Sequence, residues 1–155
     1  MLRSLWAIGG NLATARYALA GAGTQTAGLS FGGSAGSASA VTEEYDGAVW
    51  SGGGALATAR WGLAGAGTQT AGLSFGGSTG VNSAVTEEYD GTVWSRSGDL
   101  ATARYALAGA GTQTAGLSFG GTPNGVAYSA VTEEYTPGGG GTATDLTSLA
   151  SFGIF

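Results

Sequence analysis

The chain has 155 residues, which is enough for one ordinary domain with a sizeable core. Glycine accounts for 32 residues, but a hydrophobic content of 43% and regularly spaced aromatic residues favour packed β structure over disorder. The net charge of −5 disfavours nucleic acid as a partner, and a sequence without Cys or His excludes a disulfide framework, a thiol nucleophile and the usual zinc ligands.

One stretch of fifteen residues, LAGAGTQTAGLSFGG, occurs three times without a change, at residues 19–33, 63–77 and 107–121. An LATAR segment precedes each copy, and AVTEEY follows each copy after a loop of changing sequence. The aligned units recur every 44 residues, a period typical of solenoids, propellers and other repeat arrays. We expect residues 1–137 to form three structural repeats, and residues 138–155 to form a Gly-rich linker and an apolar tail.

Each period predicts four short strands, which in the first repeat are residues 17–21, 27–31, 40–45 and 49–50. Glycines and threonines at residues 23–26 are expected to form the first turn. Alternation places Leu29 and Phe31 on one face of the second strand, where they would pack between neighbouring units. Asp46–Gly47 is a strong signal for a hairpin between the third and fourth strands.

The two ends of the repeat pattern complement each other. Met1 aligns with Tyr45, so Leu2–Trp6 takes the place of a fourth strand that belongs to a preceding repeat. After Tyr135 the sequence reads TPGGGG where the other repeats read DGAVW or DGTVW. We therefore expect one end of the chain to supply the strand that the other end lacks. The opening ten residues are too weakly apolar for a signal peptide, and the sequence predicts no membrane insertion.

The order of landmark residues resembles that of the Kelch repeat. A Gly-Gly doublet follows a hydrophobic strand, then come a Tyr, a Trp and an Arg that opens the next unit, here Gly32–Gly33, Tyr45, Trp50 and Arg60. The resemblance covers residues 1–135 and implies a β-propeller with one four-stranded blade per repeat. Units with GTQTAG segments are also similar to Kelch-like repeats in virion proteins of tailed bacteriophages.

Three blades fall below the four to eight that propellers usually contain, and they would leave two sheet edges uncovered. We therefore expect a homodimer, in which two chains close a six-bladed ring and Leu2–Trp6 of each chain completes the third blade of the other. The small residues of ALAGAG suit strands close to a propeller axis. The alternative fold is a single-chain β-trefoil or β-prism, whose core needs larger apolar residues than these repeats offer.

Several charged and aromatic residues recur once per repeat and are expected to be structural. Each repeat has one Arg in LATAR, and the first Glu of each EE pair shares strand parity with the following Tyr. We expect an Arg–Glu ion pair in each repeat, because a buried carboxylate must be paired, while the second Glu is expected to face solvent. The predicted structural residues are Arg16, Arg60, Arg104, Glu43, Glu87, Glu133, Trp6, Trp50 and Trp94.

The paired glutamates also suggest a glycosidase, which uses two carboxylates on either side of one bond. Neighbours on a strand point to opposite faces, so the two acids of one pair cannot act together. Each pair also recurs in every repeat, whereas a catalytic site normally occurs once. We expect no enzymatic activity, no cofactor and no metal, and we keep a glycan hydrolase as a remote alternative.

The repeats differ mainly in two sets of loops. One set is residues 34–39, 78–83 and 122–129, and the other is residues 7–11, 51–55 and 95–99. In an up-and-down blade both sets leave the same face, and loops on a rigid scaffold often carry binding, although surface loops also vary without any function. The predicted binding residues are Asn82, Arg96, Asp99, Asn124 and Tyr128.

These observations favour a non-enzymatic structural or binding module, and in particular a bacteriophage virion component such as a decoration, fibre or host-contact protein. The alternative is a cytoplasmic Kelch module that binds protein or carbohydrate. Expected partners are a second copy of the chain and a glycan or protein of the host surface. The apolar tail either packs on its own propeller or docks onto other virion proteins; its large residues are Leu146, Leu149, Phe152, Ile154 and Phe155.

Overall fold

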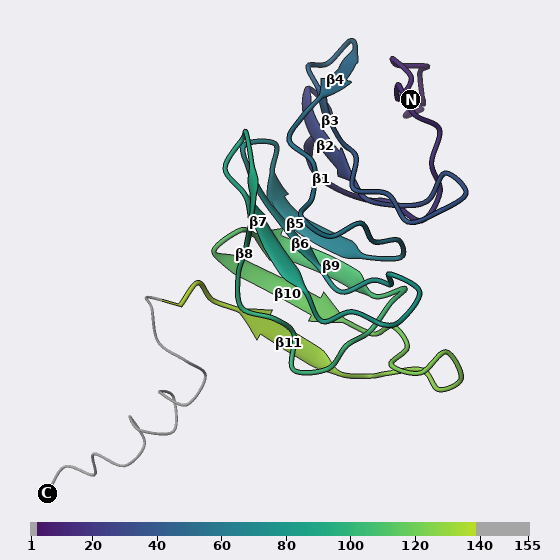
Figure 1. Cartoon of the computed structure of the whole chain (residues 1–155). Helices are drawn as coiled ribbons and strands as arrows, with labels where there is room; N and C mark the ends of the chain where they lie inside the picture. Colours follow the sequence, from purple (N-terminus) through teal and green to yellow (C-terminus); the bar gives the residue numbers. More distant parts are fainter. Residues whose placement is uncertain (1–2, 139–155) are drawn as a thin grey trace, which may run out of the picture.

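The computed structural model of the chain describes residues 3–138, which are built from β-strands and loops (Figure 1). The strands are β1 (Ala20–Thr24), β2 (Ala27–Phe31), β3 (Thr42–Tyr45) and β4 (Trp50–Gly52) in the first repeat, β5 (Ala64–Thr68), β6 (Ala71–Phe75), β7 (Thr86–Tyr89) and β8 (Trp94–Arg96) in the second, and β9 (Ala108–Thr112), β10 (Ala115–Phe119) and β11 (Thr132–Tyr135) in the third. No helix in residues 3–138 is long and apolar enough to cross a membrane.

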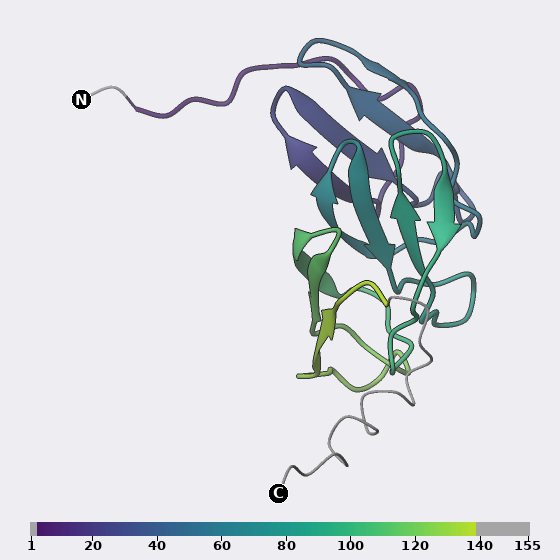
Figure 2. The ribbon, with the colours of Figure 1, turned by 90° about the vertical axis from the view of Figure 1, so that its left-hand side faces the viewer.

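Each repeat forms its own antiparallel sheet, and the strands of a sheet follow one another in sequence order. Sheet 1 has the order β1-β2-β3-β4, sheet 2 has the order β5-β6-β7-β8, and sheet 3 has the order β11-β10-β9. The predicted all-β class and the three internal repeats are therefore confirmed. The sheets lie one on another in chain order, with β1 next to β5 and β5 next to β9 (Figures 1 and 2).

The first strand of each repeat lies about three residues later than its sequence pattern suggests. We predicted residues 17–21, whereas β1 runs from Ala20 to Thr24 and turns through Gln25 and Thr26. Gly23, which resembles a turn residue, lies inside the strand with a φ of 91°, and a Cβ atom there would lie 2.1 Å from the carbonyl of Ala27 in β2. Another glycine position of the same strand is crowded by the neighbouring sheet. A Cβ atom placed on Gly65 of β5 would lie only 2.3 Å from Cζ of Phe31 in sheet 1.

The other three strands agree with the pattern more closely. The predicted second strand is confirmed as β2, and β3 begins two residues later than predicted. The hairpin at Asp46–Gly47 is also confirmed, because β3 pairs with β4 on either side of it. The Asp46 carboxylate accepts the backbone N–H groups of Ala48 and Val49, both at 2.8 Å, and so holds the turn.

The core lies between the sheets. Leu29 and Phe31 of sheet 1 are 2% and 0% exposed and pack toward sheet 2, as their position on one strand face predicted. Leu73 and Phe75 occupy the same places between sheets 2 and 3. The repeated LSF sequence therefore supplies the apolar layer at each junction between successive sheets.

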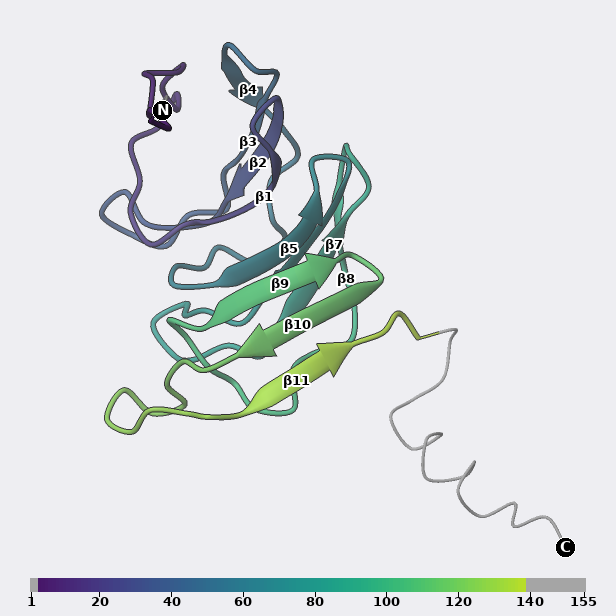
Figure 3. The ribbon, with the colours of Figure 1, turned by 180° about the vertical axis from the view of Figure 1, so that it is seen from behind.

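The outer edge of sheet 3 is β11, as the view from behind shows (Figure 3). Within the described residues, β11 has no counterpart of β4 or β8 beside it. At the other end of the molecule, residues 3–8 run away from the sheets (Figure 2), and Leu5, Trp6 and Ile8 are exposed. The predictions about the apolar tail and about Met1 and Leu2 concern residues outside the described range.

Candidate functional site

The best-defined polar site in each repeat is a buried Arg–Glu pair. In sheet 2, Nη2 of Arg60 lies 3.0 Å from Oε1 of Glu87, and both side chains are 0% exposed. Arg60 also donates to Ser74 Oγ and to the carbonyls of Gly76 and Val85, at 2.6–2.7 Å. Burial lowers the pKa of Arg60, and the charge of Glu87 opposes that effect. The pair ties the segment before β5 to the facing ends of β6 and β7.

The same arrangement occurs in the other repeats, as the recurrence of these residues suggested. Arg16 and Arg104 lie 3.0 Å from Glu43 and Glu133, respectively. In each repeat the glutamate also accepts backbone N–H groups from the LATAR segment, such as that of Ala57 at 2.6 Å from Glu87. These carboxylates are therefore occupied by structural bonds.

The second glutamate was predicted to face solvent, and this prediction is wrong for two of the three repeats. Oε1 of Glu44 accepts the hydroxyl of Tyr89 from the next sheet at 2.6 Å, and Glu88 accepts the hydroxyl of Tyr135 in the same way. Period-2 alternation gave the face of the strand correctly, but that face is covered by the following sheet. Glu134 in sheet 3 is exposed.

These tyrosines lie in an unusual electrostatic environment. Burial, and then the hydrogen bond to the Glu44 carboxylate, raise the pKa of Tyr89 to about 12. Burial and the bond to Glu88 also raise the pKa of Tyr135. The Tyr–Glu bond therefore keeps the phenol protonated and joins each sheet to the one before it.

Trp94 fills a closely fitting site between sheets 1 and 2. Its ring stacks on Tyr89 with the centroids 4.9 Å apart and lies 4.9 Å from the ring of Phe31. Its indole Nε1 donates to Oγ1 of Thr42 at 2.9 Å. Trp50 stacks on Tyr45 in a similar way but is only half-buried, and Trp6 is fully exposed.

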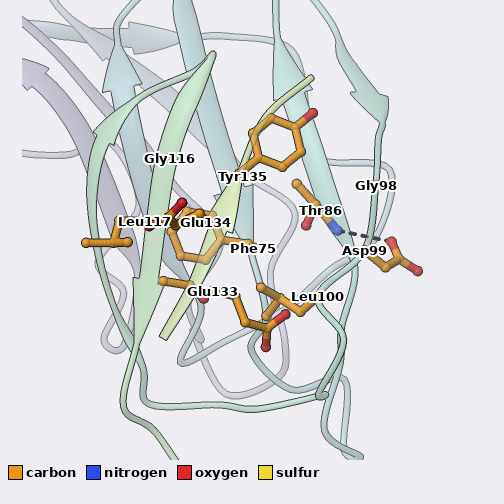
Figure 4. Close-up of a pocket in the computed structure, with 11 residues that line it drawn as sticks. Phe75, Thr86, Gly98, Asp99, Leu100, Gly116, Leu117, Glu133, Glu134 and Tyr135 are labelled. Atoms are coloured by element: carbon orange, nitrogen blue, oxygen red, sulfur yellow. Dashed lines mark hydrogen bonds between the residues drawn. The ribbon is translucent and has the colours of Figure 1, made fainter. Parts of the chain in front are cut away.

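A pocket between sheets 2 and 3 repeats the surroundings of Trp94 (Figure 4). It encloses about 320 Å³, counting the part that opens to solvent. Phe75, Thr86, Gly116 and Tyr135 line it, and Leu100 closes one side. We call this hollow the sheet 3 pocket.

The predicted binding residues all lie at the same end of the sheets, because the strands alternate in direction: Arg96 ends β8, and the other four lie in connections. The structure brings Arg96 and Asp99 together in an ion pair of 2.5 Å that is partly exposed. Asn82 donates to the carbonyl of Thr122 at 3.1 Å, which joins the variable loops of sheets 2 and 3. The Asn124 side chain holds its own loop by accepting the N–H groups of residues 126 and 127.

Tyr128 differs from these four residues, since it is 96% exposed in the longest variable loop. Two residues that the sequence analysis did not select, Val81 and Val126, are exposed in the same pair of joined loops. An apolar residue in a Gly- and Asn-rich loop is the signal that could have identified them. The joined loops 78–83 and 122–129 therefore present an apolar and aromatic surface.

The opposite end of the sheets has a different character. Nε2 of Gln69 donates to the carbonyls of Gly28 and Tyr45, and Gln113 makes the equivalent bonds to sheet 2. The TQT turns, which have the same sequence in every repeat, thus join sheets 2 and 3 to the sheet before each of them. In residues 3–138, no group of three or more His, Cys, Asp or Glu side chains could hold a metal ion. Compared with known proteins, the sequence matches no protein-family model and no curated protein.

Proposed function

We propose that the protein is a non-enzymatic binding β-propeller with a structural role in a bacteriophage virion. In this proposal each sheet is a Kelch-like blade, and two chains together form a ring of six blades. The variable loops of the ring carry recognition of a glycan or protein on the host surface. The exposed tyrosine on a scaffold of buried ion pairs is the observation that carries the proposal.

The arrangement of the sheets supports a propeller over a trefoil. Each repeat forms its own antiparallel meander, of four strands in sheets 1 and 2 and of three described strands in sheet 3, and successive sheets stack through apolar residues of their faces. The innermost strands β1, β5 and β9 contain only Ala, Gly and Thr, which suits a crowded axis. The strands of a trefoil are instead shared between repeats in one barrel.

The use of the acidic residues supports a binding role over glycan hydrolysis. A glycosidase needs two carboxylates that are free to exchange protons and about 5–10 Å apart across the bond. Here Glu87 is bonded to Arg60 and to backbone N–H groups, and Glu44 is bonded to a tyrosine of the next sheet. Both acids have a structural use that their repetition explains.

The contrast between loops and framework supports recognition at the variable end. The framework residues are identical in all repeats, whereas the loops 78–83 and 122–129 differ in length and sequence. Tyrosine is among the residues that most often dominate binding energy, and a fully exposed one can be buried by a partner without loss of folding contacts. Such loops can change their ligand while the scaffold stays the same.

Two measurements test this function. Purified virions from cells that express the chain should contain it as a stoichiometric component, and recovery only in the host cytoplasm would contradict the proposal. In a binding assay on host envelope fractions and surface polysaccharides, Tyr128→Ala should weaken binding about tenfold or more, since such anchors contribute about 2 kcal/mol. Thr114→Ala, an exposed change in a turn at the opposite end, is the matched control and should bind like the parent.

A further inference from the structure

We infer that the sheet 3 pocket receives Trp6 of a second copy of the chain, whose residues 3–8 then form the fourth strand of sheet 3. This inference rests on the proposed propeller arrangement, but it is tested by assembly and not by ligand binding. It identifies the residues that would join two chains and the chemistry of each contact.

The first argument is the match between the pocket and the site of Trp94. The side chains around Trp94 are Phe31, Thr42 and Tyr89, with Gly72 against the edge of the indole and Leu56 in the same cluster. One repeat further along, the same positions are among those that line the pocket: Phe75, Thr86, Tyr135, Gly116 and Leu100. The pocket therefore offers an aromatic stack, an apolar wall and a hydroxyl acceptor for an indole N–H.

The second argument is the path of the N-terminal segment. Gly9 and Gly10 lie on sheet 1 as Gly53 and Gly54 lie on sheet 2. Gly10 donates its N–H to the Tyr45 hydroxyl at 3.3 Å, and Gly54 donates to the Tyr89 hydroxyl at 3.2 Å. A Cβ on Gly10 would lie 2.2 Å from the carbonyl of Ala48, and one on Gly54 would lie 2.0 Å from that of Thr92.

Gly53 directly follows β4, the fourth strand of sheet 1. Since Gly9 occupies the matching place on sheet 1, the residues before Gly9 lie where the fourth strand of a sheet docked against sheet 1 would run. That segment carries Trp6 in the repeat position of Trp50 and Trp94. Its side chains at residues 5, 6 and 8 are 89–104% exposed in the single chain. A sheet that docked against sheet 1 would cover them.

The third argument is the register available at the edge of sheet 3. In sheet 2, Tyr89 pairs with Trp94 and Glu88 with Ser95 across β7 and β8. The same register on β11 sets Tyr135 opposite Trp6 of the second copy, and Glu134 opposite its Ala7. Pairing would also use the backbone groups along the outer edge of β11.

The fourth argument is the complementarity of the two outer faces. On sheet 3, Leu117 is half-buried and Phe119 is 39% exposed, although their equivalents in sheets 1 and 2 are buried. In the junctions within the chain, those equivalents pack against glycines of the next sheet. Leu29 meets Gly72, for example, and Phe75 meets Gly109.

On sheet 1 the matching glycines are Gly28 and Gly21, and they would receive Leu117 and Phe119 of another copy. The polar contacts match as well. Tyr45 would donate to Glu134, as Tyr89 does to Glu44. The contact is head-to-tail, and two such contacts related by a two-fold axis close a ring of two chains.

The second copy is a better occupant than the same chain. Residues 3–10 and β11 lie at opposite ends of the stack of sheets, with sheet 2 between them (Figures 1 and 3). The apolar residues after Gly138 are the competing occupant. They contain no tryptophan, so they lack an indole N–H for the Thr86 hydroxyl.

The native mass tests the inference first. The intact chain should have twice its chain mass of 15.0 kDa in sedimentation analysis at micromolar concentration. Trp6→Ala should weaken the dimer at least a hundredfold and leave single chains. Tyr128→Ala, which also removes an exposed aromatic ring, should leave the dimer intact. A parent protein of single-chain mass would overturn the inference, and so would a Trp6→Ala dimer of unchanged affinity.

A pair of threonines provides a matched control. Thr86→Val should remove the acceptor for Trp6 of the second copy and weaken the dimer about tenfold. Thr42→Val removes the equivalent acceptor of Trp94 inside the chain. It should lower the melting temperature and leave the dimer affinity of the folded protein unchanged. Equal effects of the two changes on the dimer would contradict the assignment of the pocket.

Cross-linking tests the register directly, because the sequence contains no cysteine that could interfere. The variant Ala7→Cys with Glu134→Cys should oxidise to a covalent dimer, since opposite residues on paired strands lie within disulfide range. Ala7→Cys with Tyr128→Cys should not. A disulfide formed within a single chain would overturn the inference. Loss of host-surface binding in a protein that still forms this dimer would instead contradict only the proposed function.

Discussion

Sheets 2 and 3 contain the same LAGAGTQTAGLSFGG stretch but differ in what surrounds it. Leu73 and Phe75 of sheet 2 are 0% and 2% exposed, whereas Leu117 of sheet 3 is half-buried and Phe119 is 39% exposed. Tyr89 is fully buried under the sheet before it, and Glu88 is covered by the sheet after it. Each repeat thus has residues that can pack against the sheet before it and residues that can pack against the sheet after it. Whether these residues are buried depends on whether a neighbouring sheet is present.

The substitution with the largest expected effect on stability removes the buried Arg60–Glu87 ion pair of sheet 2. Arg60→Ala should lower the free energy of unfolding by about 3–5 kcal/mol, because it leaves the Glu87 carboxylate buried without its cation. Urea denaturation followed by tryptophan fluorescence measures the loss. Arg96→Ala is the control, since its pair with Asp99 is exposed and should contribute under about 1 kcal/mol. Similar losses for the two variants would show that burial does not distinguish them.

The phenylalanines of the repeated LSF sequence test the apolar side of the same comparison. Phe75→Ala should cost about 3–5 kcal/mol in urea denaturation, because it opens a cavity between sheets 2 and 3. Phe119→Ala should cost clearly less in the single chain, in which its ring is partly solvated. Measuring both in the Trp6→Ala background keeps assembly out of the comparison. An equal loss would mean that sheet 3 is covered in the single chain.

The tyrosine between sheets 1 and 2 predicts a pH dependence. The pKa of Tyr89 is about 12 in the folded protein and about 10 when unfolded, so its contribution is complete below pH 10. As the pH rises from 10 through 12, about 2–3 kcal/mol of stability should be lost. Unfolding in urea at several pH values measures this slope. Tyr89→Phe should show a smaller slope, and an unchanged slope would assign the effect to other groups.

The smallest expected effect concerns a glycine on the inner strands. Gly65→Ala should cost about 1–3 kcal/mol, because the new Cβ would lie 2.3 Å from Phe31. Gly21→Ala occupies the same repeat position but meets only the carbonyl of Leu29, at 3.2 Å, among the described atoms. Gly21→Ala should cost less stability in the single chain than Gly65→Ala does. It should weaken the dimer, because Phe119 of another copy would pack against Gly21. Thermal unfolding and sedimentation separate the two outcomes.

The sequence predicted the repeats, the second strand and the Arg–Glu pairs, because each depends on a pattern within one period. It misplaced β1, because Gly23 and Thr24 resemble turn residues when read locally. Gly23 instead has a φ of 91° inside the strand, where a Cβ atom would lie 2.1 Å from the carbonyl of Ala27 on the paired strand. The partner of Glu44 was missed for a related reason: alternation gives a face of the strand, but it does not show what covers that face.

The candidate binding loops were harder to predict at the level of single residues. Length and sequence differences located loops 34–39, 78–83 and 122–129, whereas residues 51–52 and 95–96 of the other set belong to β4 and β8. The side chains of Asn82, Asp99 and Asn124 bond to backbone groups nearby. An amide or carboxylate in a loop has the same appearance in a sequence whether it holds the loop or faces a ligand. Exposure separates Tyr128 from them, and exposure depends on the folded loop.

The junction bonds described above also have a direction, and this direction has a genetic consequence. Gln69, Tyr89 and Trp94 of sheet 2 all donate to acceptors on sheet 1, whereas Asn82 in a variable loop donates to sheet 3. Through these three repeated side chains, each unit carries donors for one neighbour and acceptors for the other. An unequal crossover between the coding sequences of two repeats would add or remove one whole unit. Each new boundary would still join a donor side to an acceptor side. A gene of this kind can therefore change the number of its units in one step without creating a mismatched junction.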